Sequence, residues 1–232
     1  MKEEKQLKFS FDVLVFPLLF LFLMWFVYFI ETTFRFGLNE FGIYPRRIEG
    51  LQGIIFSPFL HSTLKHLFNN TFPILILTTA LFYFYKKISF QVFIYGWLLS
   101  GVITWIIGRP SFHIGASGII YVLASFILFK GLFVKNYRLI ALSLVVVFIY
   151  GSMFWYVLPI AEERISWEGH LAGFITGLLL AVIFRKNILP PRKYVWETDL
   201  YNEKEDPFLK HFDENGNFIP SSEMEKEEKS DE

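Results

Sequence analysis

Six long apolar runs are the feature of this sequence that most limits the folds it can adopt. They lie at residues 13–30, 60–85, 88–107, 117–129, 139–159 and 170–184. About 20 apolar residues in a helix cross the hydrocarbon core of a membrane, which is roughly 30 Å thick. A mean hydropathy of +0.42, with 29 Phe in 232 residues, is also far too apolar for a soluble domain of this size. We therefore expect an all-α membrane protein with six transmembrane helices.

The segments outside these runs divide the chain into three parts. Residues 1–12 form the N-terminus, residues 13–187 hold the six spans, and residues 188–232 form a tail. From residue 187 onward the chain has 6 Lys/Arg and 13 Asp/Glu, a composition that predicts a largely disordered tail with at most a weak hairpin at residues 213–217.

The flanks of the spans predict how the chain is oriented. The first run should be a retained span, because no small-residue cleavage site of a signal peptide follows it. Residues 31–59 mix charged and aromatic side chains, so we expect a long, partly helical loop in the membrane interface. If both termini are cytoplasmic, the inside flanks carry twelve Lys/Arg and the outside flanks five. That asymmetry favours a multi-pass protein of the cell membrane with both termini inside.

Two polar residues stand at the heads of the fourth and sixth apolar runs. Ser117 lies in Gly115-Ala116-Ser117-Gly118, and His170 opens the sixth run. Both runs are short, since the 13 residues of the fourth give a helix of only about 20 Å. Their outward ends should stop below the outer membrane surface, in a cavity that water reaches. A Ser and a His in such a place suggest a nucleophile and its base.

Other residues fit the same chemistry. Gly115 and Gly118 allow the backbone to approach a substrate closely, and the N–H of Ser117 at a helix N-terminus could stabilise an oxyanion. His66 and Asn70 are four residues apart, so they share a helix face and both can donate hydrogen bonds. None of the six runs contains Asp or Glu, which favours a Ser-His dyad over a triad. Without cysteine the chain cannot form a disulfide or a Cys-ligated metal site, and we expect no cofactor or metal.

Simpler interpretations exist for each motif taken alone. Gly-Ala-Ser-Gly in a membrane helix is often only a close-packing motif, and Gly173 and Gly177 form a GxxxG packing motif. His66 and Asn70, with His61, could instead be a hydrogen-bond network between helices or part of a transport path. The coincidence of all these residues on outward helix ends favours a reactive site.

Taken together, the motifs make the chain resemble the rhomboid intramembrane serine proteases over residues 13–186. The matching segments are HSTLKHLFNN at residues 61–70, GASGIIY at residues 115–121 and GHLAGFITG at residues 169–177. The resemblance implies a rhomboid-like bundle with a long first loop, Ser117 as nucleophile and His170 as general base. It also implies an oxyanion hole made by His66, Asn70 and the N–H of Ser117.

The resemblance further implies supporting roles. Tyr121 would stack on the ring of His170, His61 would be a structural histidine, and Gly173 and Gly177 would let the sixth helix press against the fourth. Many rhomboids carry a Trp-Arg pair in the first loop, whereas here the comparable stretch is Tyr44-Pro45-Arg46-Arg47. The departure concerns the conformation of that loop more than the activity.

Three functions are compatible with these features. The first is a serine endopeptidase that cleaves transmembrane segments of other proteins, with the lipid bilayer and such substrates as partners and no nucleic acid. The second is a non-catalytic rhomboid-like protein that binds membrane proteins. The third is a small transporter, which the nearly apolar inner halves of the spans disfavour.

Overall fold

The computed structural model describes residues 10–134, 136–159, 165–186, 194, 196 and 201–221. Its α-helices are α1 (Asp12–Phe34), α2 (Gly53–Phe56), α3 (Leu64–Phe84), α4 (Ser89–Ile107), α5 (Ser117–Phe133), α6 (Tyr137–Tyr150) and α7 (Trp167–Ile183). Its 3-10 helices are η1 (Leu38–Phe41), η2 (Ile48–Gln52), η3 (Ser57–Phe59), η4 (Gly151–Val157), η6 (Glu203–Glu205) and η7 (Leu209–His211). The chain separates into two compact units, Met1–Ile188 and Leu189–Glu232.

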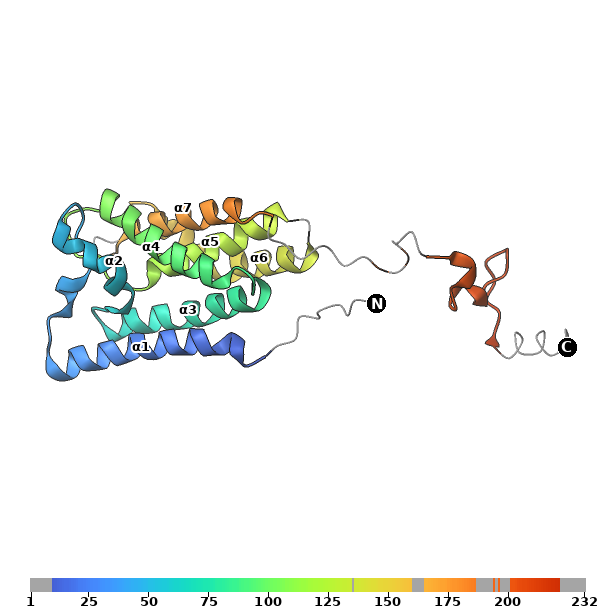
Figure 1. The fold of residues 1–232 in the computed structure, drawn as a ribbon, viewed down its shortest axis with the longest axis horizontal. Helices are drawn as coiled ribbons and strands as arrows, with labels where there is room; N and C mark the ends of the chain where they lie inside the picture. The colour runs from blue at the N-terminus through green and yellow to red at the C-terminus, as the bar shows by residue number, and fades with distance from the viewer. Residues whose placement is uncertain are drawn as a thin grey trace. The chain divides into compact units, whose positions relative to one another are not determined.

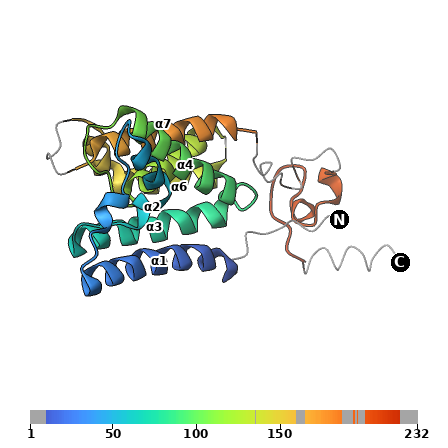
Figure 2. The ribbon, with the colours of Figure 1, turned by 60° about the vertical axis from the view of Figure 1, so that its left-hand side comes forward.

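Within the first unit, six long helices form a bundle with α5 at its centre. Helix α1 lies beside α3, whereas α5 contacts α3, α4, α6 and α7 (Figures 1 and 2). Residues 119–127 of α5 are all buried. Because protein surrounds α5, this helix can be shorter than a membrane is thick without exposing its ends to lipid.

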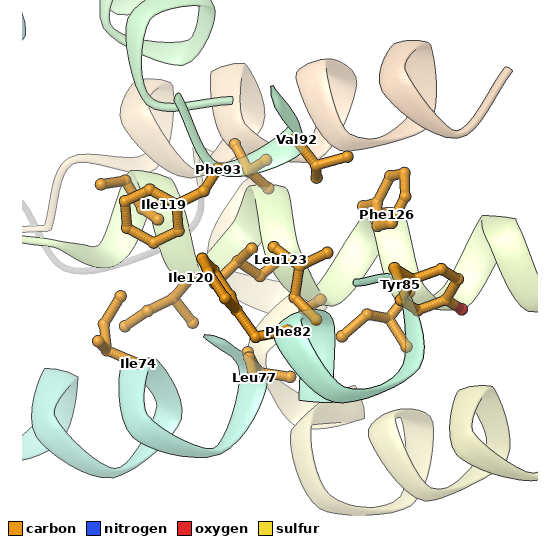
Figure 3. Packing of buried hydrophobic residues seen from close by; sticks show 14 of the residues in the cluster. Ile74, Leu77, Phe82, Tyr85, Val92, Phe93, Ile119, Ile120, Leu123 and Phe126 are labelled. Atoms are coloured by element: carbon orange, nitrogen blue, oxygen red, sulfur yellow. The ribbon is translucent and has the colours of Figure 1, made fainter. Parts of the chain in front are cut away.

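The core forms where α3, α4 and α5 meet. Figure 3 shows Ile74 and Leu77 of α3 and Phe93 of α4 packed towards Ile120 and Leu123 of α5, and these side chains are at most 1% exposed. Lipid tails are as apolar as these side chains, so in a membrane the contacts stabilise the bundle through van der Waals packing. These contacts fix the position of α5, which carries Ser117 at its N-terminus.

The lengths of the helices agree with the expected six-helix membrane fold. Among the residues that the structure describes, four segments are long and apolar enough to cross a membrane, namely α1, α3, α4 and the continuous stretch of α6 and η4 at residues 137–157. Helices α5 and α7 are also apolar but have only 17 residues each. The prediction that the fourth and sixth helices are the short ones is therefore confirmed.

Helix α5 extends beyond its predicted end at residue 129. Lys130, which follows directly after the fourth apolar run, is fully buried, and its Nζ donates a hydrogen bond to the main-chain oxygen of Phe184. Phe184 is the C-cap of α7, whose last carbonyls lack partners within their own helix. A cation at that negative helix end is stabilised, so the charge stays inside the bundle and α5 continues to Phe133.

Helix α7 begins three residues earlier than predicted. Ser166 is its N-cap, and the Ser166 side chain accepts a hydrogen bond from the N–H of Gly169. Glu168, which precedes the sixth apolar run, therefore lies in the first turn of α7 and is 2% exposed. Glu31 likewise lies within α1, which is longer than the first apolar run. The apolar runs themselves hold no carboxylate, but the longer helices formed around them do.

The second and fifth predicted spans change character at one end. Helix α3 starts at Leu64, where Thr63 caps it by accepting a hydrogen bond from the N–H of His66, so His61 lies before the helix. The fifth run is α-helical only to Tyr150 and continues as the 3-10 helix η4. The carbonyl oxygens of η4 consequently lie in positions that an α-helix would not give them.

The first loop is folded back onto the bundle. It holds η1, η2, α2 and η3, and the main chain of Ile43 pairs with that of His113 in an antiparallel bridge. The guanidinium of Arg46 donates hydrogen bonds to the carbonyls of Ile106 (3.1 Å) and Gly108 (2.7 Å) at the C-terminal end of α4. Arg46 thus attaches the loop to α4 although the Trp-Arg pair is absent.

The second unit is described at residues 194, 196 and 201–221. Phe212 and Phe218 form an isolated antiparallel bridge, and Asp213 accepts hydrogen bonds from the N–H groups of Asn215 and Asn217. A short hairpin is therefore present at the predicted position. The rest of the tail lies outside the described residues, and its disorder stays a prediction.

Candidate active site

Ser117 occupies the first position of α5, directly after a turn that requires glycine. Gly115 has φ of +104°, a conformation that L-residues rarely adopt, and its N–H donates to the carbonyl of Ser57 at 2.8 Å. The turn ends at Ala116, the N-cap of α5. Because the first N–H groups of a helix lack intrahelical partners, the N–H of Ser117 is available to another acceptor.

The turn lies against the face of α3 that carries His66 and Asn70. A Cβ added at Gly115 would be 2.6 Å from Nε2 of His66 and 3.8 Å from Nδ2 of Asn70. Asn70 is buried, and its Nδ2 donates one hydrogen bond to the carbonyl of His66 at 2.9 Å. An amide NH₂ has two hydrogens, so one remains for another acceptor. Donors from α3 and the head of α5 therefore converge at this turn.

The ring of His61 packs against the ring of His66 and supports its position at the turn. His61 is 1% exposed, and its ring centroid lies 4.9 Å from that of His66. Its Nδ1 lies 3.3 Å from the carbonyl of Phe59. Burial, together with the neighbouring His66, lowers the pKa of His61 to about 3, so His61 is neutral at physiological pH.

The imidazole of His170 is held by contacts from two directions. Its ring stacks on Tyr121 of α5 with centroids 4.3 Å apart and an interplanar angle of 17°. Its Nδ1 lies 3.0 Å from the carbonyl oxygen of Tyr156 in η4. A carbonyl can only accept, so Nδ1 carries the proton and Nε2 of the neutral ring is free to take one.

The main-chain carbonyls of η4 were not foreseen from the sequence. Besides the contact of Tyr156 with His170, the hydroxyl of Tyr121 donates to the carbonyl of Met153 at 2.5 Å. The ring that stacks on His170 is thereby fixed as well. Every residue has a carbonyl, so no residue type at positions 153 or 156 could have revealed these contacts.

Helices α5 and α7 approach each other closely because glycines line their interface. A Cβ at Gly173 would overlap the carbonyl oxygen of Gly118, and a Cβ at Gly177 would overlap Oγ of Ser125. At Gly118 an added Cβ would lie 3.6 Å from the carbonyl oxygen of Gly169, which is an ordinary contact. The close packing brings the head of α7, with His170, beside the head of α5.

A polar cavity beside Ser117 and an apolar recess beside η4 lie in this region of the described structure. A cavity of about 40 Å³ touches Ser117 and Gly118, and its polar lining is Ser57, Ser100, Thr104, His113 and Ser166. Its volume and polar groups suit bound water. An apolar recess lies between η4 and α7, where Phe154, Trp155, Val157, Leu158 and Phe174 line it.

One buried polar cluster near the site was also missed from the sequence. His113 Nδ1 lies 2.6 Å from Oγ of Ser166, and Arg109 pairs with Glu168. Burial is the main cause that lowers the pKa of His113. The only signal in the sequence was their position, since Arg109 and His113 precede Ser117, and Ser166 and Glu168 precede His170.

Comparison with known proteins gives a family match and several relatives. A family model described as "Rhomboid domain" matches residues 49–187, a range that includes Ser117 and His170. Uncharacterized proteins of Mycobacterium bovis and Mycobacterium tuberculosis are each 35% identical to this chain over 178 residues, which is 72% of either chain. An uncharacterized protein of Mycobacterium leprae is 34% identical over 174 residues, which is 72% of this chain and 69% of the relative.

Proposed function

This chain belongs to the rhomboid family and is a multi-pass membrane protein, and we propose that it is an intramembrane serine endopeptidase. In this proposal Ser117 is the nucleophile and His170 is the general base. The observation that carries it is the state of the His170 ring, which Tyr121 and the carbonyl of Tyr156 hold with Nε2 unprotonated. Main-chain and aromatic contacts then take the role that a carboxylate has in a triad.

The proposed reaction uses groups that already converge at the head of α5. His170 Nε2 removes the proton from Oγ of Ser117, which attacks the substrate carbonyl. The N–H of Ser117, the ring of His66 and the second amide hydrogen of Asn70 stabilise the oxyanion. His170 then protonates the leaving amine, and water hydrolyses the acyl-enzyme. The polar cavity of about 40 Å³ beside Ser117 supports this last step, because it can hold water near the ester.

The proposed substrates are single-span membrane proteins. A serine at the head of a short, buried helix reaches only segments that enter the bundle, and a helical substrate must unwind to present a carbonyl there. The apolar recess between η4 and α7 supports entry from the lipid side. Following the distribution of Lys and Arg, we place both termini in the cytoplasm and the site towards the outer face.

The test is cleavage of a model transmembrane substrate by purified protein in liposomes. We expect Ser117→Ala and His170→Ala to abolish cleavage. Ser125→Ala is the matched control, since Ser125 lies two turns further along α5 and its hydroxyl bonds only carbonyls of its own helix, those of Tyr121 and Val122. Cleavage by both variants at the parental rate contradicts the proposal. Capture of an uncut substrate by the parent would instead indicate a non-catalytic binding protein.

A further inference from the structure

A buried polar cluster joins the segment before α5 to the first turn of α7. It consists of Arg109, His113, Ser166 and Glu168, and we refer to it as the Arg109–Glu168 cluster. Glu168 is 2% exposed and His113 is 4% exposed. Buried charged and polar groups are costly unless they are paired, so their presence calls for a specific arrangement of partners.

Three hydrogen bonds connect Arg109 to the start of α7. The main-chain N–H of Arg109 donates to Oε1 of Glu168 at 3.2 Å, and Nη1 of Arg109 lies 3.4 Å from Oε2. Nη2 of Arg109 donates to the carbonyl of Ile165 at 2.8 Å. Both carboxylate oxygens of Glu168 are thus bound to one residue of the other segment.

His113 and Ser166 form a second connection a few residues further along. Nε2 of His113 lies 3.1 Å from the carbonyl of Arg109, so this nitrogen carries the proton. Nδ1 therefore accepts from the hydroxyl of Ser166 at 2.6 Å. The same hydroxyl accepts from the N–H of Gly169 and caps α7. One oxygen consequently links His113 to the helix that carries His170.

The two connected segments lead directly to the proposed catalytic pair. His113 precedes Ser117 by four residues, and its main chain is paired with Ile43 of the first loop through hydrogen bonds of 2.8 and 3.0 Å. Glu168 precedes His170 by two residues, which on a helix is about 200° of rotation. Its carboxylate therefore lies on a different side of α7 from the stacked ring, and its contacts with Arg109 fix the rotation of α7.

We propose that the side chains of the Arg109–Glu168 cluster are positioning residues, which set the distance and orientation of His170 relative to Ser117. The proposal rests on the proposed function. Reacting groups must be held within a fraction of an ångström, and a misplacement of about 1 Å costs roughly 100-fold in rate. His113 and Ser166 line the water cavity beside Ser117, but no side chain of the cluster takes part in the proposed proton transfer or oxyanion contacts. The cluster should therefore act on the chemical step and leave substrate binding unchanged.

The experiment compares variants with and without one hydrogen-bonding group. Ser166→Thr keeps the hydroxyl, whereas Ser166→Val has nearly the same volume without it. Glu168→Gln keeps the shape and removes the charge. Arg109→Gln, alone and combined with Glu168→Gln, tests whether the two residues act as a unit. Asp12→Asn is the control, because Asp12–Lys86 is an exposed ion pair within the part of the chain that the structure describes.

Two measurements separate positioning from folding. A fluorophosphonate probe gives the initial rate of Ser117 labelling, and the final extent of labelling counts correctly folded sites. Cleavage of a model transmembrane substrate gives kcat per labelled site and KM. Ser117→Ala, measured in parallel, tests the proposed function independently.

We expect Ser166→Val and Glu168→Gln to lower kcat and the labelling rate about tenfold or more, with KM changed by less than about twofold. The double variant should lose about as much as the worse single variant, and Ser166→Thr and Asp12→Asn should resemble the parent. The proposal is overturned if Ser166→Val and Glu168→Gln keep the parental kcat per labelled site. It is also overturned if their loss of total activity is explained wholly by a smaller number of correctly folded sites, as counted by the final extent of labelling. In both cases the proposed function stands if Ser117→Ala is inactive. If Ser117→Ala cleaves like the parent, both proposals fall.

Discussion

The turn at Gly115 offers a sharp test of the site, because the two glycines that flank Ser117 have opposite requirements. Gly115 has φ of +104°, and an added Cβ would lie 2.6 Å from Nε2 of His66. Gly118 has no such φ, and its added Cβ would meet only the carbonyl oxygen of Gly169 at 3.6 Å and Oγ of Ser100 at 3.9 Å. We therefore predict that Gly115→Ala is strongly damaging and that Gly118→Ala is tolerated.

The expected magnitudes follow from these contacts. A non-glycine residue in the left-handed region costs about 1–3 kcal/mol of stability. The overlap with His66 displaces its ring, and loss of one oxyanion donor lowers kcat by about 10²–10³. At Gly118, alanine makes ordinary contacts and favours the helix by up to about 1 kcal/mol relative to glycine.

The assay is kcat on a transmembrane substrate together with thermal unfolding in detergent. Gly115→Ala should lose at least about 100-fold in kcat, and Gly118→Ala should stay within about threefold of the parent. If Gly115→Ala keeps parental activity, the placement of His66 against the turn is wrong. If Gly118→Ala loses as much as Gly115→Ala, the explanation by φ and overlap fails.

Three further predictions concern the supporting contacts. Tyr121→Phe removes the hydrogen bond to the carbonyl of Met153 and should lower the free energy of unfolding by about 1 kcal/mol, as measured by thermal unfolding. Tyr121→Ala also removes the ring that stacks on His170 and should lower kcat at least about tenfold. Lys130→Ala leaves the carbonyl of Phe184 without its buried donor and should destabilise the protein by about 1–3 kcal/mol, with kcat per folded molecule unchanged. Burial lowers the pKa of His61 to about 3, below its unfolded value of about 6.5, so the folded state resists protonation. The contribution of His61 to the free energy of unfolding should therefore be complete above about pH 6.5 and should fall by up to about 1.4 kcal/mol per pH unit as the pH drops towards 3. In melting curves measured from pH 7 to 4, His61→Asn should show a weaker dependence on pH than the parent.

The helices and the head of α5 were predictable because their signals are local. Each apolar run gave a helix, and the Gly-Ala-Ser-Gly turn placed the start of α5 at Ser117, where the structure has it. The shortness of α5 and α7 was also visible, since polar residues bound both runs. These features depend on neighbouring residues alone.

The two charged residues that were misplaced depend on partners far along the chain. Lys130 bonds to the carbonyl of Phe184, 54 positions away, and Glu168 pairs with Arg109, 59 positions away. A charged residue is expected to face water, because burying an unpaired charge is costly. Only the folded structure brings the compensating partner close, so the C-terminal end of α5 and the start of α7 could not be predicted from the sequence.

The proposed catalytic site also combines features with local sequence signals and contacts between residues distant in the chain. Ser117 and His170 stood out as polar residues at the heads of apolar helices, and the resemblance to rhomboids added Tyr121. The contact that orients His170 comes from the main-chain carbonyl of Tyr156 in η4, which no residue type in the sequence indicates.

The central claim is that His170 activates Ser117. The most direct measurement is site-resolved mass spectrometry of the protein after reaction with a fluorophosphonate, for the parent and for His170→Ala. We predict a single adduct on Ser117 in the parent and almost none in His170→Ala, with both proteins folded. An adduct that forms equally well without His170, or one that forms elsewhere and never on Ser117, would contradict it.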